Sequence, residues 1–118
     1  MNKQEYFNAA VSCDINNERV DSISKLYGIE LPEELKHVVS YADTVGFFDE
    51  ERRALSYAEI IEPLKKIGFD FIEKGLIPII DAYDNTYIVF SFESKRWMKY
   101  NLSDDIEFDE SDKFMEVL

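Results

Sequence analysis

The spacing of hydrophobic residues follows a helical repeat in the first half of the chain and an alternating repeat in the second half. Val20, Ile23 and Tyr27 recur at three- and four-residue intervals, which place them on one side of an amphipathic helix. The apolar residues of 35–42 form a second stripe with helical spacing. We therefore expect one helix that ends at Tyr27 and a second helix that begins at Pro32.

The ends of the expected helices carry residues that suit those positions. Gly28 can adopt the left-handed backbone that stops a helix, and Pro32 suits a first helical turn. Ser56 and Glu59 have the spacing of a capping box, which predicts a third helix. Pro63 lies too deep for a regular helix and should kink or restart it. The side chains expected to point inward from this helix are Ile60, Ile61, Leu64 and Ile67.

Strands are expected after Gly46, which closes the second helix. Short strands at 47–48 and 54–57 flank the charged turn 49–53. In the last part of the chain, apolar and polar residues alternate, as they do on half-buried strands. Pro78 lacks a backbone N–H, which favours an edge or strand-start position. The strands expected in this part are 76–80, 86–93 and 96–102, joined by short turns.

The order of these elements predicts the fold class. Phe114 and Val117 suit a terminal helix that packs back on the strands, and 4–13 has the composition of a short first helix. Helices followed by strands are typical of an α+β fold rather than of alternating βαβ units. We predict a single domain over 1–118, with N-terminal helices, an antiparallel β-meander and a short C-terminal helix. Within it, residues 1–16 are expected to form an N-terminal extension helix.

Acidic residues outnumber basic residues by a wide margin. The 118 residues include 25 Asp and Glu against 13 Lys and Arg, which gives a formal net charge of −12. The segment 101–118 contains seven acids and one base, so −6 of this charge lies there. Such a surface repels nucleic acid and anionic membranes, whereas it attracts a basic protein. The alternative is a charge run that is only a solvated face, and charge alone does not decide between the two.

Motifs that would name a chemistry are missing from the sequence. One cysteine, Cys13, and one histidine, His37, are too few for a disulfide framework or a zinc site. Cys13 is expected to be a small, buried or half-buried side chain. His37 lies off the apolar stripe of its helix and is expected to face solvent or the edge of the buried face. Carboxylates within 105–116 have the spacing of a calcium loop, but Glu110 occupies the position that requires glycine. We expect no catalytic site, cofactor or metal, and a small enzyme that uses carboxylates is the least favoured alternative.

The sequence also lacks signals for secretion or membrane insertion. Its first residues contain no apolar core of a signal peptide, and no stretch approaches the roughly 20 apolar residues that span a bilayer. We therefore expect a cytoplasmic protein.

Short motifs along the chain occur in an order that resembles the SUKH superfamily. This is the Smi/Knr-type domain of fungal cell-wall regulators and of many bacterial immunity proteins. The motifs are Gly28-Ile29 at a helix end, Leu31-Pro32-Glu33-Glu34-Leu35 at a helix start, Gly46, the helix entry Ser56-Tyr57-Ala58-Glu59-Ile60, the strand Leu76-Ile77-Pro78-Ile79, the turn Asp84-Asn85 and the strand Tyr87-Ile88-Val89-Phe90. The chain departs from the family at Val45-Gly46, where Asn-Gly is common, and in the turn 81–86, which is often rich in glycine.

The resemblance implies a non-catalytic domain whose usual bacterial role is immunity. Such a protein neutralises a cognate toxin, very often a nuclease, inside the cell that produces it. The fungal relatives imply an alternative, a regulatory or scaffolding module with no toxin partner. On either interpretation we expect a monomer or weak homodimer that binds a basic protein partner and neither nucleic acid nor membrane.

Candidate binding residues follow from charge and from the enrichment of Trp and Tyr at interface hot spots. Trp97 and Tyr83 are candidate aromatic anchors; the alternatives are a core side chain for Trp97 and a turn residue for Tyr83. The candidate carboxylates are Asp81, Asp84, Glu93, Asp104, Asp105, Glu107 and Asp109.

Overall fold

The computed structural model describes residues 1–49 and 52–118. Its helices are α1 (Lys3–Ser12), α2 (Asn17–Tyr27), α3 (Glu33–Ser40), α4 (Tyr57–Ile61), α5 (Pro63–Lys66), α6 (Phe71–Lys74) and α7 (Phe114–Val117). Its strands are β1 (Phe47–Asp49), β2 (Arg52–Ala54), β3 (Leu76–Asp81), β4 (Thr86–Ser91), β5 (Trp97–Asn101) and β6 (Ile106–Ser111).

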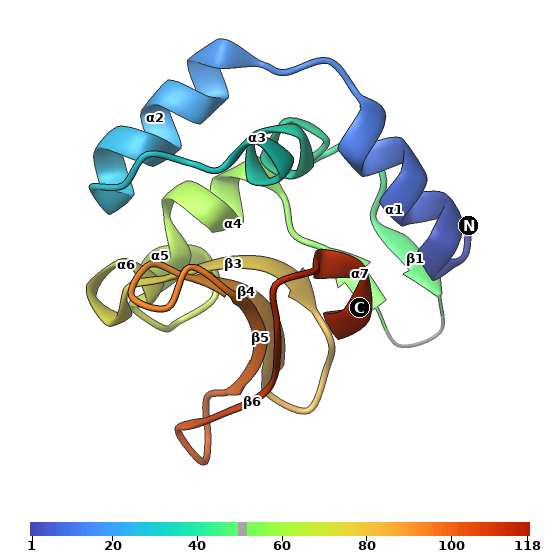
Figure 1. The fold of residues 1–118 in the computed structure, drawn as a ribbon. Coiled ribbons are helices and arrows are strands. Elements are labelled where there is room, and N and C mark those ends of the chain that lie inside the picture. The colour runs from blue at the N-terminus through green and yellow to red at the C-terminus, as the bar shows by residue number, and fades with distance from the viewer. Residues whose placement is uncertain (50–51) are drawn as a thin grey trace.

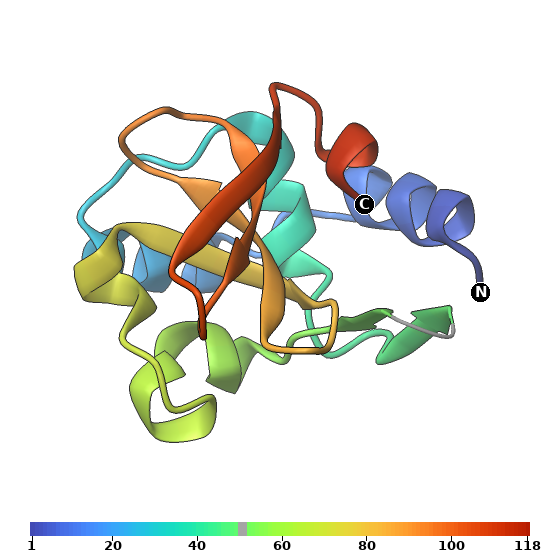
Figure 2. The ribbon, with the colours of Figure 1, turned by 90° about the horizontal axis from the view of Figure 1, so that it is seen from below.

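The described strands form one sheet in chain order from β1 to β6, and each neighbouring pair is antiparallel. Helices α1 to α4 lie on one side of this sheet, and α7 packs beside β5 and β6 (Figure 1). From below, β6 passes in front of the other main strands (Figure 2). The predicted α+β class, with N-terminal helices, an antiparallel sheet and a short C-terminal helix, is confirmed.

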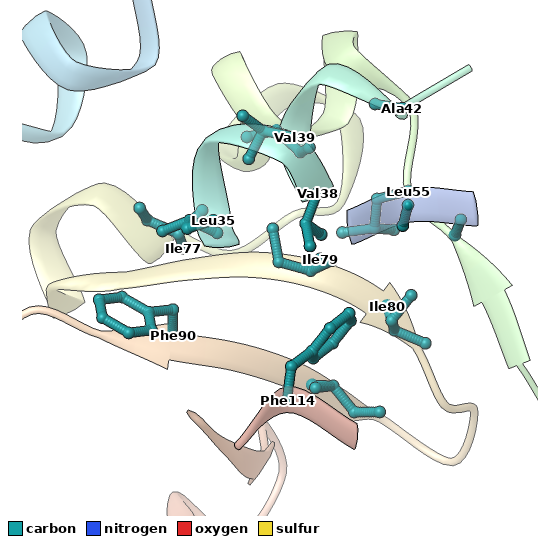
Figure 3. Close-up of a cluster of buried hydrophobic side chains, with 14 of the residues drawn as sticks. Leu35, Val38, Val39, Ala42, Leu55, Ile77, Ile79, Ile80, Phe90 and Phe114 are labelled. Atoms are coloured by element: carbon teal, nitrogen blue, oxygen red, sulfur yellow. The ribbon is translucent and has the colours of Figure 1, made fainter. Parts of the chain in front are cut away.

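Apolar side chains are buried on both faces of the central strands. On the helical side, Leu35 and Val38 of α3 lie over Ile77 and Ile79 of β3, and Phe114 of α7 joins the same cluster (Figure 3). A smaller cluster covers the opposite face, where α6 packs against β3. Its buried members are Phe71, Leu76, Val89, Met98 and Tyr100.

The helix signals in the sequence have the expected geometry. Gly28 ends α2 with a φ of 71°, and its N–H donates to the Ser24 carbonyl at 2.9 Å. Ser56 and Glu59 form the reciprocal capping box at the start of α4. Pro63 begins α5 directly after α4, so the helix restarts as predicted. Leu64, however, is 61% exposed rather than inward.

Three predicted boundaries are wrong. Helix α3 ends at Ser40, and a turn rather than helix leads to Gly46. The predicted strand 54–57 is wrong beyond its first residue, because β2 ends at Ala54 and the capping box at Ser56 begins α4 at Tyr57. The expected charged turn 49–53 is also too long: Asp49 belongs to β1 and residues 52–53 to β2, and residues 50–51 lie outside the described residues.

Three features of the sheet region differ from the sequence expectation. Pro78 lies within β3 opposite Val89 of β4, next to a register shift, and the pairing of β3 with β2 involves only Ile80 and Asp81. Helix α6 was not predicted, although Asp70 caps it and Gly75 ends it with a φ of 79°. Strand β6 was not predicted either, because acidic residues have low strand propensity.

A partly buried charge network joins β2, α4 and β3. The two guanidinium nitrogens of Arg53 donate to the two carboxylate oxygens of Glu59 at 2.9 Å each. Arg53 also pairs with Asp81 at 3.4 Å. Burial raises the pKa of Glu59, but the hydrogen bonds from Arg53 and Ser56 outweigh it and hold the pKa below its usual value. Glu59 is therefore charged in the folded protein and binds β2 to the start of α4.

We predict that Glu59→Gln lowers the free energy of unfolding by about 2 kcal/mol, because it replaces the two charge-assisted hydrogen bonds from Arg53 and leaves Asp81 as its only carboxylate partner among the described residues. Denaturant unfolding measures this loss. Glu30→Gln, at an exposed position, is the matched control and should have little effect.

The effect of Glu59→Gln should also depend on pH. The folded-state pKa lies below the unfolded-state value of about 4.3, so the contribution of Glu59 is complete above that value. It is lost as the pH falls through the folded-state pKa, and the two unfolding curves should converge there. A difference between wild type and variant that stays constant into strong acid would contradict this account.

Candidate protein-binding surface

Most of the candidate carboxylates lie on the hairpin formed by β5 and β6. Strand β6 is the last strand of the sheet, and every residue from 106 to 110 is exposed. The seven acidic side chains of the segment 101–118 are all exposed. These residues are Asp104, Asp105, Glu107, Asp109, Glu110, Asp112 and Glu116.

The turn between β3 and β4 lies beside the turn between β5 and β6. The Leu102 N–H donates to the Asn85 carbonyl, and the Asn85 side chain donates to the Ser103 hydroxyl, both at 2.8 Å. The Asn101 side chain donates to the Asp84 carbonyl at 3.2 Å. Asp84 and Asp104 therefore belong to one end of the sheet, although they are far apart in the sequence.

Glu93 lies at the other end of the hairpins, in the turn between β4 and β5. It lines an open hollow of about 660 Å³ together with Lys74 and Phe92. Glu107 and Glu110 of β6 complete the side of this hollow. Three carboxylates and one ammonium group therefore line the hollow, and its net negative charge favours a cationic side chain.

Cations from neighbouring elements offset part of the acidity of the hairpin. Lys99 pairs with Asp109 at 3.2 Å, and Arg96 contacts both Glu110 and Asp112 at 3.5 and 3.0 Å. Among the described residues, the candidate carboxylates of Asp84, Glu93, Asp104 and Glu107 form no ion pair, although the charge of Lys74 acts on Glu107.

Asp105 is held by two partners on the same side of the hairpin. Its carboxylate accepts hydrogen bonds from the Tyr100 hydroxyl at 2.5 Å and from the Lys74 ammonium at 2.9 Å. Both contacts lower the pKa of Asp105, with the tyrosine as the larger influence. Burial and the bond to Asp105 raise the pKa of Tyr100. This aspartate therefore keeps its charge to a lower pH than an ordinary surface aspartate.

Three other candidate binding residues make contacts within the fold. Trp97 is only 3% exposed and stacks on Phe114 with ring centroids 4.2 Å apart, so the core interpretation describes it. Tyr83 has a φ of 64° and donates its N–H to the Asp81 carboxylate at 2.9 Å, as a turn residue does. Asp81 also pairs with Arg53 and is therefore partly occupied in the fold.

Two exposed apolar residues on β6 were missed by the sequence reasoning. Ile106 is 51% exposed and Phe108 is 37% exposed. They alternate with acids in the run Ile106-Glu107-Phe108-Asp109, which is a strand pattern. That alternation was the available signal, and the density of acidic residues obscured it.

Cys13 and His37 lie next to each other without forming a reactive pair. The Cys13 thiol contacts the His37 carbonyl at 3.1 Å, and His37 Nδ1 lies 2.6 Å from the Cys13 carbonyl. The side chains are therefore directed to backbone groups and not to each other. Burial raises the pKa of the Cys13 thiol, which opposes formation of the nucleophilic thiolate.

The described residues contain no group of three or more His, Cys, Asp or Glu side chains placed to hold a metal ion. They also contain no helix with the length and apolar character that a membrane crossing requires. The calcium-loop spacing noted in the sequence falls largely on the extended strand β6.

Comparisons with known proteins add no relative: no family model, curated protein or solved structure matches the chain.

We predict that Tyr100→Phe and Lys74→Ala each raise the pKa of Asp105 toward the ordinary aspartate value of about 3.9. Each change removes one donor that stabilises the charged carboxylate. Carboxyl carbon chemical shifts, followed by NMR through an acid titration, measure this pKa. Lys99→Ala is the matched control, because Lys99 pairs with Asp109 instead. Identical Asp105 titrations in wild type, Tyr100→Phe and Lys74→Ala would rule out the proposed origin of the shift.

Proposed function

We propose that this chain is a non-catalytic binding domain that neutralises a toxic protein by covering its basic surface. The observation that carries the proposal is the exposed acidic hairpin of β5 and β6 at the edge of the sheet. The resemblance to SUKH immunity proteins supports the same role. In this role the protein acts in the cytoplasm and needs no cofactor.

The electrostatics of the hairpin suit such a partner. A nuclease toxin presents a basic groove that binds the phosphates of its substrate, and a row of carboxylates can occupy that groove. The charges of Asp104, Glu107 and Glu93, which form no ion pair in the fold, would attract the partner over a distance. The same charges discourage binding of nucleic acid to the protein itself.

Charge reversal on the hairpin should slow association with the partner. We predict that Asp104→Lys combined with Glu107→Lys lowers the association rate roughly tenfold at low salt and flattens its salt dependence. Asp105 is left intact, because Lys74 and Tyr100 already hold its carboxylate. The measurement is stopped-flow association with the toxic domain encoded beside this gene, after co-expression has shown that this chain restores growth.

The matched control is Asp14→Lys combined with Asp21→Lys. It changes the net charge equally, at two exposed positions on the helical side of the molecule. Equal slowing by both double variants would mean that overall charge, and not the hairpin, governs encounter. Failure of the chain to protect cells from any neighbouring gene product would contradict the immunity role itself, and capture of a non-toxic partner would favour the regulatory alternative.

A further inference from the structure

We propose that the free edge of β6 accepts an extended segment of the partner as an added strand, and that this segment alternates apolar and basic side chains. The inference rests on the proposed function for the basic character of the partner. It adds the mode of binding and the sequence pattern that is recognised.

The first observation is that β6 offers an open edge. It pairs with β5 on one side and is the last strand in the order of the sheet. Residues 106–110 are exposed, and no ribbon lies across the strand in the view from below (Figure 2). An edge strand presents unpaired N–H and C=O groups, which another extended chain can pair with.

The second observation is the different chemistry of the two faces of β6. Ile106 and Phe108 stand opposite Asn101 and Lys99 of β5 and leave an apolar pair exposed on one face. Glu107 stands opposite Tyr100, on the face that carries the acidic hollow.

Side chains of an added strand would alternate between these faces with a period of two. One set would cover Ile106 and Phe108, and the other set would meet Glu107 and the hollow with Glu93 and Glu110. Apolar residues suit the first set and Lys or Arg suits the second.

Charge argues against a second copy of this chain as the occupant. Two β6 strands placed side by side would bring Glu107, Asp109 and Glu110 of each copy close to the same acids of the other. Like charges directly opposite each other destabilise a strand pair, and each chain carries a net charge of −12. The left-handed Asp109, with a φ of 55°, marks a bulge near the register shift between β5 and β6, and it limits an added strand of either origin to the neighbouring residues.

Protection of the edge does not by itself explain the surface. Acids and a bulge are devices that prevent unwanted pairing of edge strands. The exposed Ile106 and Phe108 work against such protection, because apolar side chains on an edge promote association. A basic, alternating segment reconciles both features, since only such a segment gains from the acids and from the apolar pair together.

The experiment uses the full chain and the capped hexapeptide Lys-Val-Lys-Ile-Lys-Val as the probe. Amide hydrogen exchange, read residue by residue by NMR, should show protection of the β6 amides when the peptide binds at low salt. A peptide with the same residues in blocks, Lys-Lys-Lys-Val-Ile-Val, should bind at least about fivefold more weakly. Two further peptides carry N-methyl groups on the odd-numbered or on the even-numbered residues, which removes backbone N–H donors and keeps the charge. The peptide whose methylated residues would donate to β6 should bind about tenfold more weakly.

A variant pair tests the apolar face. Ile106→Ser combined with Phe108→Ser should weaken binding of the alternating peptide, and both side chains are exposed enough for the fold to be kept. The control is Leu26→Ser combined with Leu64→Ser, which removes two exposed apolar side chains elsewhere. This control should leave peptide binding unchanged.

The proposal is overturned if the peptide does not bind, or if both N-methylated peptides bind as tightly as the parent peptide. It is also overturned if the β6 amides become protected without peptide as the protein concentration rises, because the occupant would then be a second copy. These failures leave the proposed function standing if Asp104→Lys with Glu107→Lys still slows association with the toxic partner. Loss of that effect, or of cellular protection, would instead reject the proposed function.

Discussion

The central strands of this sheet are apolar on both faces, and the rest of the architecture follows from the need to cover them. Ile77, Ile88 and Phe90 require a layer on one side, which the N-terminal helices and α7 provide. Val89 and Met98 lie on the opposite face, where Phe71 of α6 packs against them. These two layers use up the larger apolar surfaces of the helices. The edge strand, β6, is covered only near Ser111, where α7 packs beside it, and its residues 106–110 stay exposed.

Electrostatic balance then decides which parts of that edge stay available. Lys99 and Arg96 stand next to acids of β6 and reduce the repulsion that would otherwise oppose hairpin formation. Asp105 is similarly tied to Tyr100 and Lys74. The charges left over, rather than the total of −12, are what a partner would meet at short range. Net charge thus sets long-range attraction, and pairing within the fold sets the local pattern.

The elements best predicted from the sequence are those specified by local backbone chemistry. Gly28 stops α2 because a left-handed residue is required there, and Ser56 with Glu59 begins α4 because the two side chains satisfy adjacent N–H groups. Elements were predicted less well where tertiary contacts override the local preference of the sequence. Pro78 lies where β3 pairs with β4 but not with β2, and acid-rich β6 is a strand because β5 pairs with it.

The candidate surface shows the same division. The sequence by itself determined the fold class, the strong acidity and the concentration of that acidity in the last part of the chain, since composition and periodicity are local properties. Only the tertiary structure decided that Trp97 belongs to the core, that Asp84 lies beside the Asp104 turn and that Glu93 shares a hollow with Glu107. These relations depend on which strands are neighbours and which face of each strand is covered. Long-range pairing and packing fix both, and no short stretch of the chain contains that information.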